Sequence, residues 1–81
     1  MGAVKYDPEV DVLYVLLSNA DVARTRPLDD LRIIDYDAAN AVIGVEFVNA
    51  MSGIDLAGVP SATEIERLLD ESGLDLPRNA A

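Results

Sequence analysis

The chain has 81 residues, of which 15 are acidic and six are basic, so its formal net charge is −9. It contains no cysteine and no histidine, which excludes disulfides and the usual zinc sites and leaves acid–base chemistry to carboxylates. A surface this negative repels nucleic acids and anionic membranes, so we expect neither as a partner, whereas a basic protein would suit it.

Length and composition predict one domain with one hydrophobic core. Apolar residues make up 51% of the chain, which is typical of a folding sequence rather than a disordered one. We expect the domain to cover residues 1–76 and a frayed tail to cover residues 77–81. No signal-peptide pattern and no apolar run near the roughly 20 residues of a membrane span is visible, so the expected location is cytoplasmic.

The sequence up to residue 48 predicts short strands, because segments rich in Val, Leu, Ile and Tyr alternate with turn residues. These strands are expected near residues 3–6, 11–18, 22–26, 31–37 and 41–48. Asp7 and Pro8 suit the first turn, and Asn40 suits a left-handed position in the turn before the last strand. Short connections between consecutive strands favour an antiparallel meander.

A helix is predicted over residues 62–72, after a loop of mixed character. Ser61 and Glu64 have the spacing of a capping box, and Gly73 suits the position just beyond the helix end. The helix carries an apolar stripe formed by Ala62, Ile65, Leu68 and Leu69. The predicted fold class is therefore α+β: a four- to five-stranded antiparallel meander sheet with one C-terminal amphipathic helix packed on it.

Alternation along the strands assigns one face of the sheet to the core. The residues expected to be buried together are Leu13, Val15, Leu17, Ile43, Val45, Phe47, Ile65 and Leu69. The second face is also apolar, through Val12, Tyr14, Leu16, Val42 and Val48. One helix covers only one face, so a second copy is the simplest cover for the other, and we predict a homodimer. Alternatively, the loop over residues 49–60 folds back and covers that face.

Two runs of the sequence resemble a known family. The run from Val4 to Ser18 resembles the pattern V-x-Y-D-x-E-x-D-x-L-Y-I-x-L-S, and the run from Ile34 to Phe47 resembles D-Y-D-x-x-G-x-V-V-G-I-E-I. These are the signatures of the family named domain of unknown function 2283, and the resemblance reaches Ser52. Asn40 stands where the family usually has glycine. The resemblance implies a small prokaryotic protein without an assigned function, similar to the acidic half of toxin–antitoxin-like pairs.

Carboxylates are the only candidates for a chemical site. Asp7, Glu9 and Asp11 have the alternate spacing that opens a calcium loop, but the glycine and glutamate that such a loop needs at later positions are absent. We therefore favour turn and strand-start roles for them. The alternative, a divalent-metal site at these three residues, stays open.

Glu46 lies in the middle of the last strand between apolar neighbours. A buried glutamate could act as an acid or base, but we favour a cross-strand ion pair of Glu46 with Arg24, Arg26 or Arg32. We assign no catalytic, cofactor-binding or metal-binding residue. The leading interpretation is a non-catalytic interaction domain that associates with itself, with a basic protein, or with both. The alternative is a carboxylate-based metal-binding protein or enzyme that uses Asp7, Glu9, Asp11 or Glu46.

Overall fold

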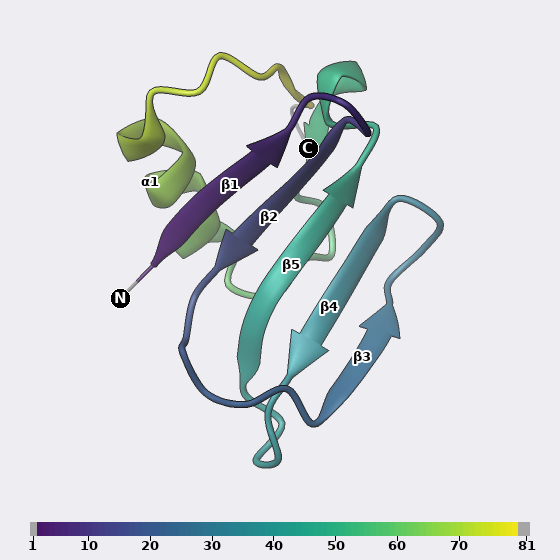
Figure 1. Cartoon of the computed structure of the whole chain (residues 1–81), viewed down its shortest axis with the longest axis vertical. Helices are drawn as coiled ribbons and strands as arrows, with labels where there is room; N and C mark the ends of the chain where they lie inside the picture. The colour runs from purple at the N-terminus through teal and green to yellow at the C-terminus, as the bar shows by residue number, and fades with distance from the viewer. Residues whose placement is uncertain (1, 80–81) are drawn as a thin grey trace.

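The apolar, β-branched segments of the chain form an antiparallel sheet, and the amphipathic segment packs on it as a helix (Figure 1). The computed structural model describes residues 2–79. In chain order the elements are β1 (Ala3–Asp7), β2 (Val12–Leu16), β3 (Arg24–Pro27), β4 (Arg32–Tyr36), β5 (Val42–Val48), the 3-10 helix η1 (Ala50–Ser52), β6 (Ile54–Asp55), α1 (Ala62–Ser72) and β7 (Arg78–Asn79). The predicted α+β class, with five antiparallel strands and a C-terminal helix, is confirmed.

The strand order β1-β2-β5-β4-β3 differs from the predicted meander. Strand β2 pairs with β5, with Val12 opposite Val48 and Leu16 opposite Gly44, rather than with the next strand along the chain. The composition of the strands explains this order. β2 and β5 are the strands richest in apolar residues and occupy the middle, whereas the mostly exposed sequence of β3, Arg-Thr-Arg-Pro, lies at an edge.

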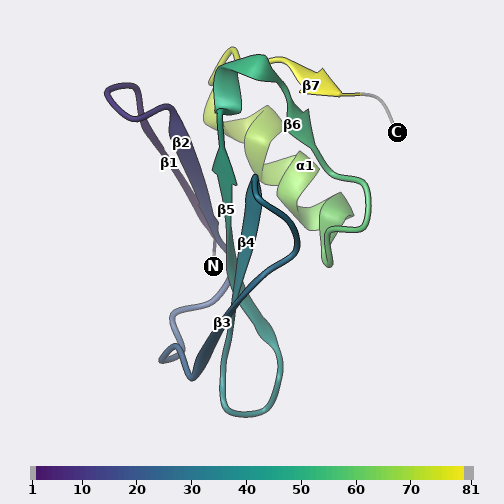
Figure 2. The same ribbon diagram turned by 90° about the vertical axis from the view of Figure 1, so that its right-hand side faces the viewer.

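One face of the sheet is covered by α1 and by the segment over residues 49–60 (Figure 2). The core cluster between these layers consists of Leu13, Val15, Ile34, Val45, Phe47, Ala50, Ile54, Val59, Ile65, Leu68 and Leu69. Because Ile54 and Val59 belong to this cluster, the loop packs on the same side as the helix. It does not cover the second face of the sheet, so that alternative is wrong.

The predicted core is confirmed except at its margins. Of the eight residues, all but Leu17 are buried, and Leu17 is half-buried against the core cluster, but Ile43 is buried outside that cluster. The pairing of β4 with β5 shifts its register between Asp35, which lies opposite Gly44, and Tyr36, which lies opposite Val42. Ile43 therefore has no partner residue on β4 and forms a β-bulge. Val42 consequently packs with Tyr36 against the core cluster, and its predicted place on the second face is wrong.

The two ends of α1 differ in how well the sequence predicted them. Ser61 has a left-handed backbone (φ 60°) and makes no side-chain cap, and Glu64 instead pairs with Arg67, so the predicted capping box is wrong. Gly73 ends the helix in the predicted left-handed conformation (φ 75°). Among the described residues no helix has the length and apolar character needed to cross a membrane.

The C-terminal segment returns to the body of the protein. β7 runs parallel to β6, and the Ile54 N–H donates a hydrogen bond of 2.7 Å to the Pro77 carbonyl. Arg78 also forms an ion pair with Asp70 of α1 at 2.7 Å. The sequence suggested fraying from Pro77 onward. These contacts reach Asn79, and residues 80–81 lie outside the described part of the chain.

Candidate functional site on the open face of the sheet

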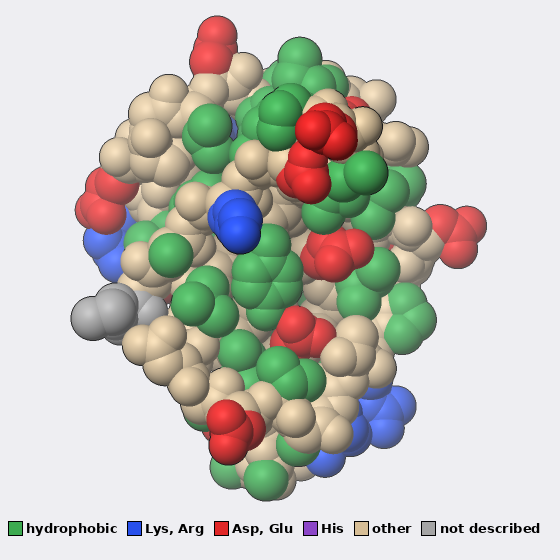
Figure 3. Space-filling view, in the orientation of Figure 1, with side chains coloured by type: hydrophobic (Ala, Val, Ile, Leu, Met, Phe, Trp, Pro, Cys, Tyr) green, Lys and Arg blue, Asp and Glu red, His purple; other side chains and the backbone are tan. Residues whose placement is uncertain are grey.

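The face of the sheet opposite α1, here called the open face, is turned toward the viewer in Figures 1 and 3. It carries half-buried hydrophobic side chains, those of Val12, Tyr14, Leu16, Ile33 and Val48. The alternation of β2 and β4 puts them there, because Leu13, Val15 and Ile34 point into the core. Ile33 was not predicted on this face. Figure 3 shows hydrophobic and acidic side chains mixed over the face, with a basic side chain near its middle.

Tyr14 lies across the neighbouring strand β5 and reaches β4. Its hydroxyl donates a hydrogen bond of 2.8 Å to Asp35 Oδ2. Gly44 of β5 lies beneath the ring, since an added Cβ there would be 2.2 Å from Tyr14 Oη. Glycine at position 44 therefore provides the room that lets a tyrosine of one strand bond to an aspartate two strands away.

Asp35 also connects this arrangement to the edge strand β3. Its Oδ1 accepts a hydrogen bond of 2.6 Å from Thr25 Oγ1 of β3, so one carboxylate holds side chains from β2 and β3. Burial, followed by the hydrogen bond to Asp35, raises the pKa of Tyr14 to about 12. At neutral pH the phenol is consequently a hydrogen-bond donor and not a base, which argues against general-base catalysis by this group.

Lys5 and Glu46 flank Tyr14 on either side. Register places Lys5 of β1 and Glu46 of β5 both opposite Tyr14, in one row across the sheet. Within residues 2–79 neither side chain takes part in a hydrogen bond or an ion pair. The predicted ion pair of Glu46 with an arginine is therefore wrong. Lys5, the only lysine of the chain, is the one basic residue that the described strands present on this face.

Two carboxylates of the first hairpin, those of Asp7 and Asp11, have structural roles, whereas Glu9, among the described residues, contributes only its backbone N–H. Asp7 Oδ1 accepts a hydrogen bond of 3.0 Å from the Glu9 N–H within the turn. Asp11 has a left-handed backbone (φ 56°), and its Oδ1 accepts hydrogen bonds from Tyr6 Oη at 2.7 Å and from the Met51 N–H at 2.9 Å. It thereby ties the hairpin to η1. No group of three or more metal-ligating side chains occurs in the part of the chain described, so nothing here supports the metal hypothesis.

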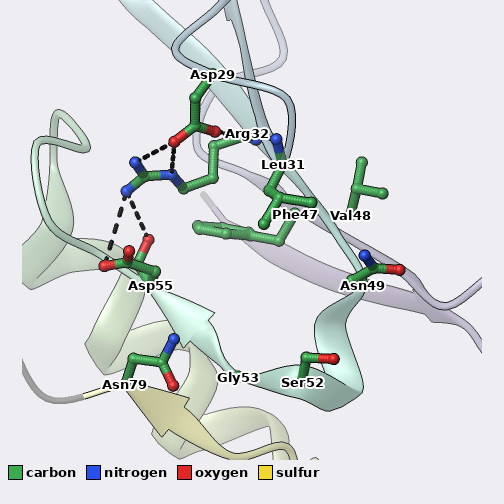
Figure 4. A pocket seen from close by; sticks show the side chains of 10 residues that line it. All are labelled: Asp29, Leu31, Arg32, Phe47, Val48, Asn49, Ser52, Gly53, Asp55 and Asn79. Carbon is green, nitrogen blue, oxygen red and sulfur yellow. Dashed lines mark hydrogen bonds and ion pairs between the residues drawn. The ribbon is translucent and has the colours of Figure 1, made fainter.

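Arg32 fixes the loop after β6 and borders a small cavity of about 110 Å³ (Figure 4). Its Nε donates to Asp29 Oδ2 at 3.1 Å, and Nη1 donates to the carbonyls of Asp55, at 3.1 Å, and of Ala57. Hydrogen bonds from Arg32 lower the pKa of Asp29 to about 2. The guanidinium is engaged by the chain itself, and the cavity is far below the ~300 Å³ of a ligand pocket, so this region is structural.

Of the comparisons with known proteins, the one with protein families agrees with the sequence resemblance. Neither the search of curated proteins nor the search of solved structures found a match. The family described as "Protein of unknown function (DUF2283)" matches residues 3–50, which include all five strands of the main sheet and the whole open face but exclude α1. Since the match covers more than half of the chain, the protein belongs to the DUF2283 family.

Proposed function

We propose that this protein is a non-catalytic interaction domain that associates with a second copy of itself through the open face. The observation that carries the proposal is the set of half-buried hydrophobic side chains there, Val12, Tyr14, Leu16, Ile33 and Val48, which no segment within residues 2–79 covers. The largest apolar patch on a monomeric protein, typically about 300–600 Å², is often a functional surface. A sheet face can pack against its own copy, at a separation of about 10 Å.

The expected association is weak. A patch of this size removes only several hundred Å² of apolar surface per copy from water, which stabilises the pair at about 25 cal/mol per Å². Lost translational and rotational freedom opposes this by about 4–15 kcal/mol, which leaves affinities that are micromolar or weaker. Two copies of charge −9 also repel each other, so moderate salt should strengthen the dimer.

The substitution Leu16→Glu tests the proposal, because it places a charge in the middle of the apolar contact without touching the core side of β2. Sedimentation velocity over a range of concentrations at moderate salt should show dimer for the wild type and monomer for Leu16→Glu. Leu74→Glu is the matched control, since Leu74 is exposed and follows α1 on the other side of the molecule. A wild type that stays monomeric at high concentration contradicts the proposal, as does equal weakening by the control.

The net charge supports a second candidate, in which the protein is the acidic member of a two-protein, toxin–antitoxin-like pair with a basic partner. Association of this kind is driven by opposite charge and weakens as salt screens it. Immobilised protein should therefore retain one defined basic protein from its native cells at low salt and release it at high salt. Retention of nothing basic contradicts this candidate and leaves self-association unaffected.

A further inference from the structure

We propose that the two copies pack with their two-fold axis parallel to β2 and over Tyr14, so that Lys5 of each copy meets Glu46 of the other. This inference rests on the proposed self-association through the open face, and it adds the orientation of the partner. It commits to one occupant, a second copy of this chain, because the row of Tyr14 carries one positive and one negative side chain, neither paired within residues 2–79, in positions that complement each other.

The positions of the two charges follow from the strand register. Lys5 and Glu46 both lie opposite Tyr14, one on each neighbouring strand. Each is thus one strand spacing, about 4.8 Å, to one side of β2. Neither has a partner within residues 2–79, whereas Asp35, the other carboxylate beside Tyr14, is held by Tyr14 and Thr25. Lys5 and Glu46 are the charged groups of this row that remain available to another molecule.

Symmetry distinguishes the ways in which two such faces can stack. A two-fold axis along β2 exchanges the left and right sides of the sheet, which places Lys5 over the partner's Glu46 twice in the same dimer. An axis across the strands leaves left and right unchanged, so it places Lys5 over Lys5 and Glu46 over Glu46. Because like charges held opposite each other oppose association, the first arrangement is favoured.

The apolar residues of β2 fit the same arrangement. With the axis along β2, the side chains of Val12 and Leu16 lie over their own copies, whereas the Tyr14 ring leans over Gly44 toward β4. In the row of Leu16, register puts Ala3 on one side and Gly44 on the other. Ala3 then faces the Gly44 of the other copy, which that copy's own Tyr14 ring covers. Aligned sheets twist by about 30° relative to each other, so the match is best near Tyr14.

Charge reversal tests the orientation. Lys5→Glu and Glu46→Lys each create two like-charge contacts, and each alone should weaken the wild-type dimer by about ten-fold or more. In an equimolar mixture the two variants meet with opposite charges at both contacts. The mixture should therefore sediment as a heterodimer with an affinity within a few-fold of wild type. Recovery on mixing also shows that both variants are folded.

A mixture of Lys5→Glu with Glu66→Lys is the control, because Glu66 lies on the exposed side of α1 and its reversal gives the same net charge at a different place. In this mixture Glu66→Lys should self-associate as the wild type does, and Lys5→Glu should not be recruited into a heterodimer. If the wild type dimerises but mixing Lys5→Glu with Glu46→Lys restores nothing, the orientation is wrong and the proposed function stands. If the wild type itself is monomeric at every concentration, the proposed function and this orientation both fail.

Discussion

The two faces of the main sheet are built from the same strands but are stabilised in different ways. On the covered face, residues such as Leu13, Val45 and Phe47 are almost completely buried against α1 and the segment over residues 49–60. On the open face, Tyr14 and Asp35 are half-buried and are held by hydrogen bonds that cross β5. Apolar burial is non-directional and depends on area, whereas hydrogen bonds depend on the position of each atom.

This difference predicts which substitutions each face tolerates. A change in side-chain volume should matter most on the covered face, where neighbouring atoms fill the space closely. A change in shape or ionisation should matter most on the open face, where the Tyr14–Asp35 bond requires both a bare Gly44 and a protonated phenol. The three predictions below test this contrast, starting with the largest effect.

Phe47→Ala should destabilise the protein by about 3–5 kcal/mol, because Phe47 is 2% exposed and its removal leaves a cavity in the core. The neighbouring substitution Val48→Ala, on the open face of the same strand, should cost about 1 kcal/mol or less. Urea unfolding followed by circular dichroism measures both. Similar losses for the two substitutions would show that the faces do not differ in packing.

Gly44→Ala should cost about 1–3 kcal/mol, because its new Cβ would collide with the ring of Tyr14 and displace it from Asp35. In a Tyr14→Ala background the three atoms nearest to that Cβ are gone, so the same change at Gly44 should cost only a few tenths of a kcal/mol. A double-mutant cycle by urea unfolding measures the coupling. Additive losses would mean that glycine is required here for a reason unrelated to Tyr14.

The smallest effect concerns alkaline pH. An unfolded tyrosine ionises near pH 10, whereas Tyr14 in the folded protein has a pKa of about 12. Between these values the folded state binds more protons, so this contribution to stability is complete below about pH 10 and is lost as the pH rises toward 12. Tyr14→Phe should therefore lose less stability than wild type over this window in urea unfolding experiments.

A retained tyrosine and a control variant make the comparison of Tyr14→Phe with wild type specific to Tyr14. Tyr6, whose pKa is raised by its hydrogen bond to Asp11, remains in both proteins and contributes equally to the slope. Tyr36→Phe provides a control that removes a phenol but leaves the Tyr14–Asp35 bond in place. If Tyr14→Phe and wild type lose stability in parallel between pH 10 and 12, the hydroxyl of Tyr14 does not form the bond to Asp35 in solution.

Local sequence patterns predicted the elements and most of the core. Alternation in the segment Val12–Leu16 separated Leu13 and Val15 from Tyr14, and turn chemistry predicted the left-handed Asn40 (φ 67°). Periodicity shows which face a side chain occupies but not which strand lies beside it. The pairing of β2 with β5 was therefore missed, and so was the register shift that moves Val42 to the core side.

The contacts that were missed at the candidate site join residues far apart in the sequence. Asp11 accepts a hydrogen bond from Met51, and Arg32 donates to the backbone carbonyls of Asp55 and Ala57. No spacing rule connects a side chain with a carbonyl group in a distant loop. The aspartate at the end of the first turn was the available signal, since aspartate tolerates the left-handed conformation that Asp11 adopts (φ 56°) better than most residues.

The central position of β5 also has a consequence for how fast the protein folds. The hairpin of β1 and β2 and the unit of β3, β4 and β5 each close over short stretches of chain. The two units become one sheet only when β5 pairs with β2, which brings Val12 to Val48 and closes the longest loop in the sheet. Closing that loop costs chain entropy before its contacts form. We therefore expect the pairing of β2 with β5 to limit the folding rate.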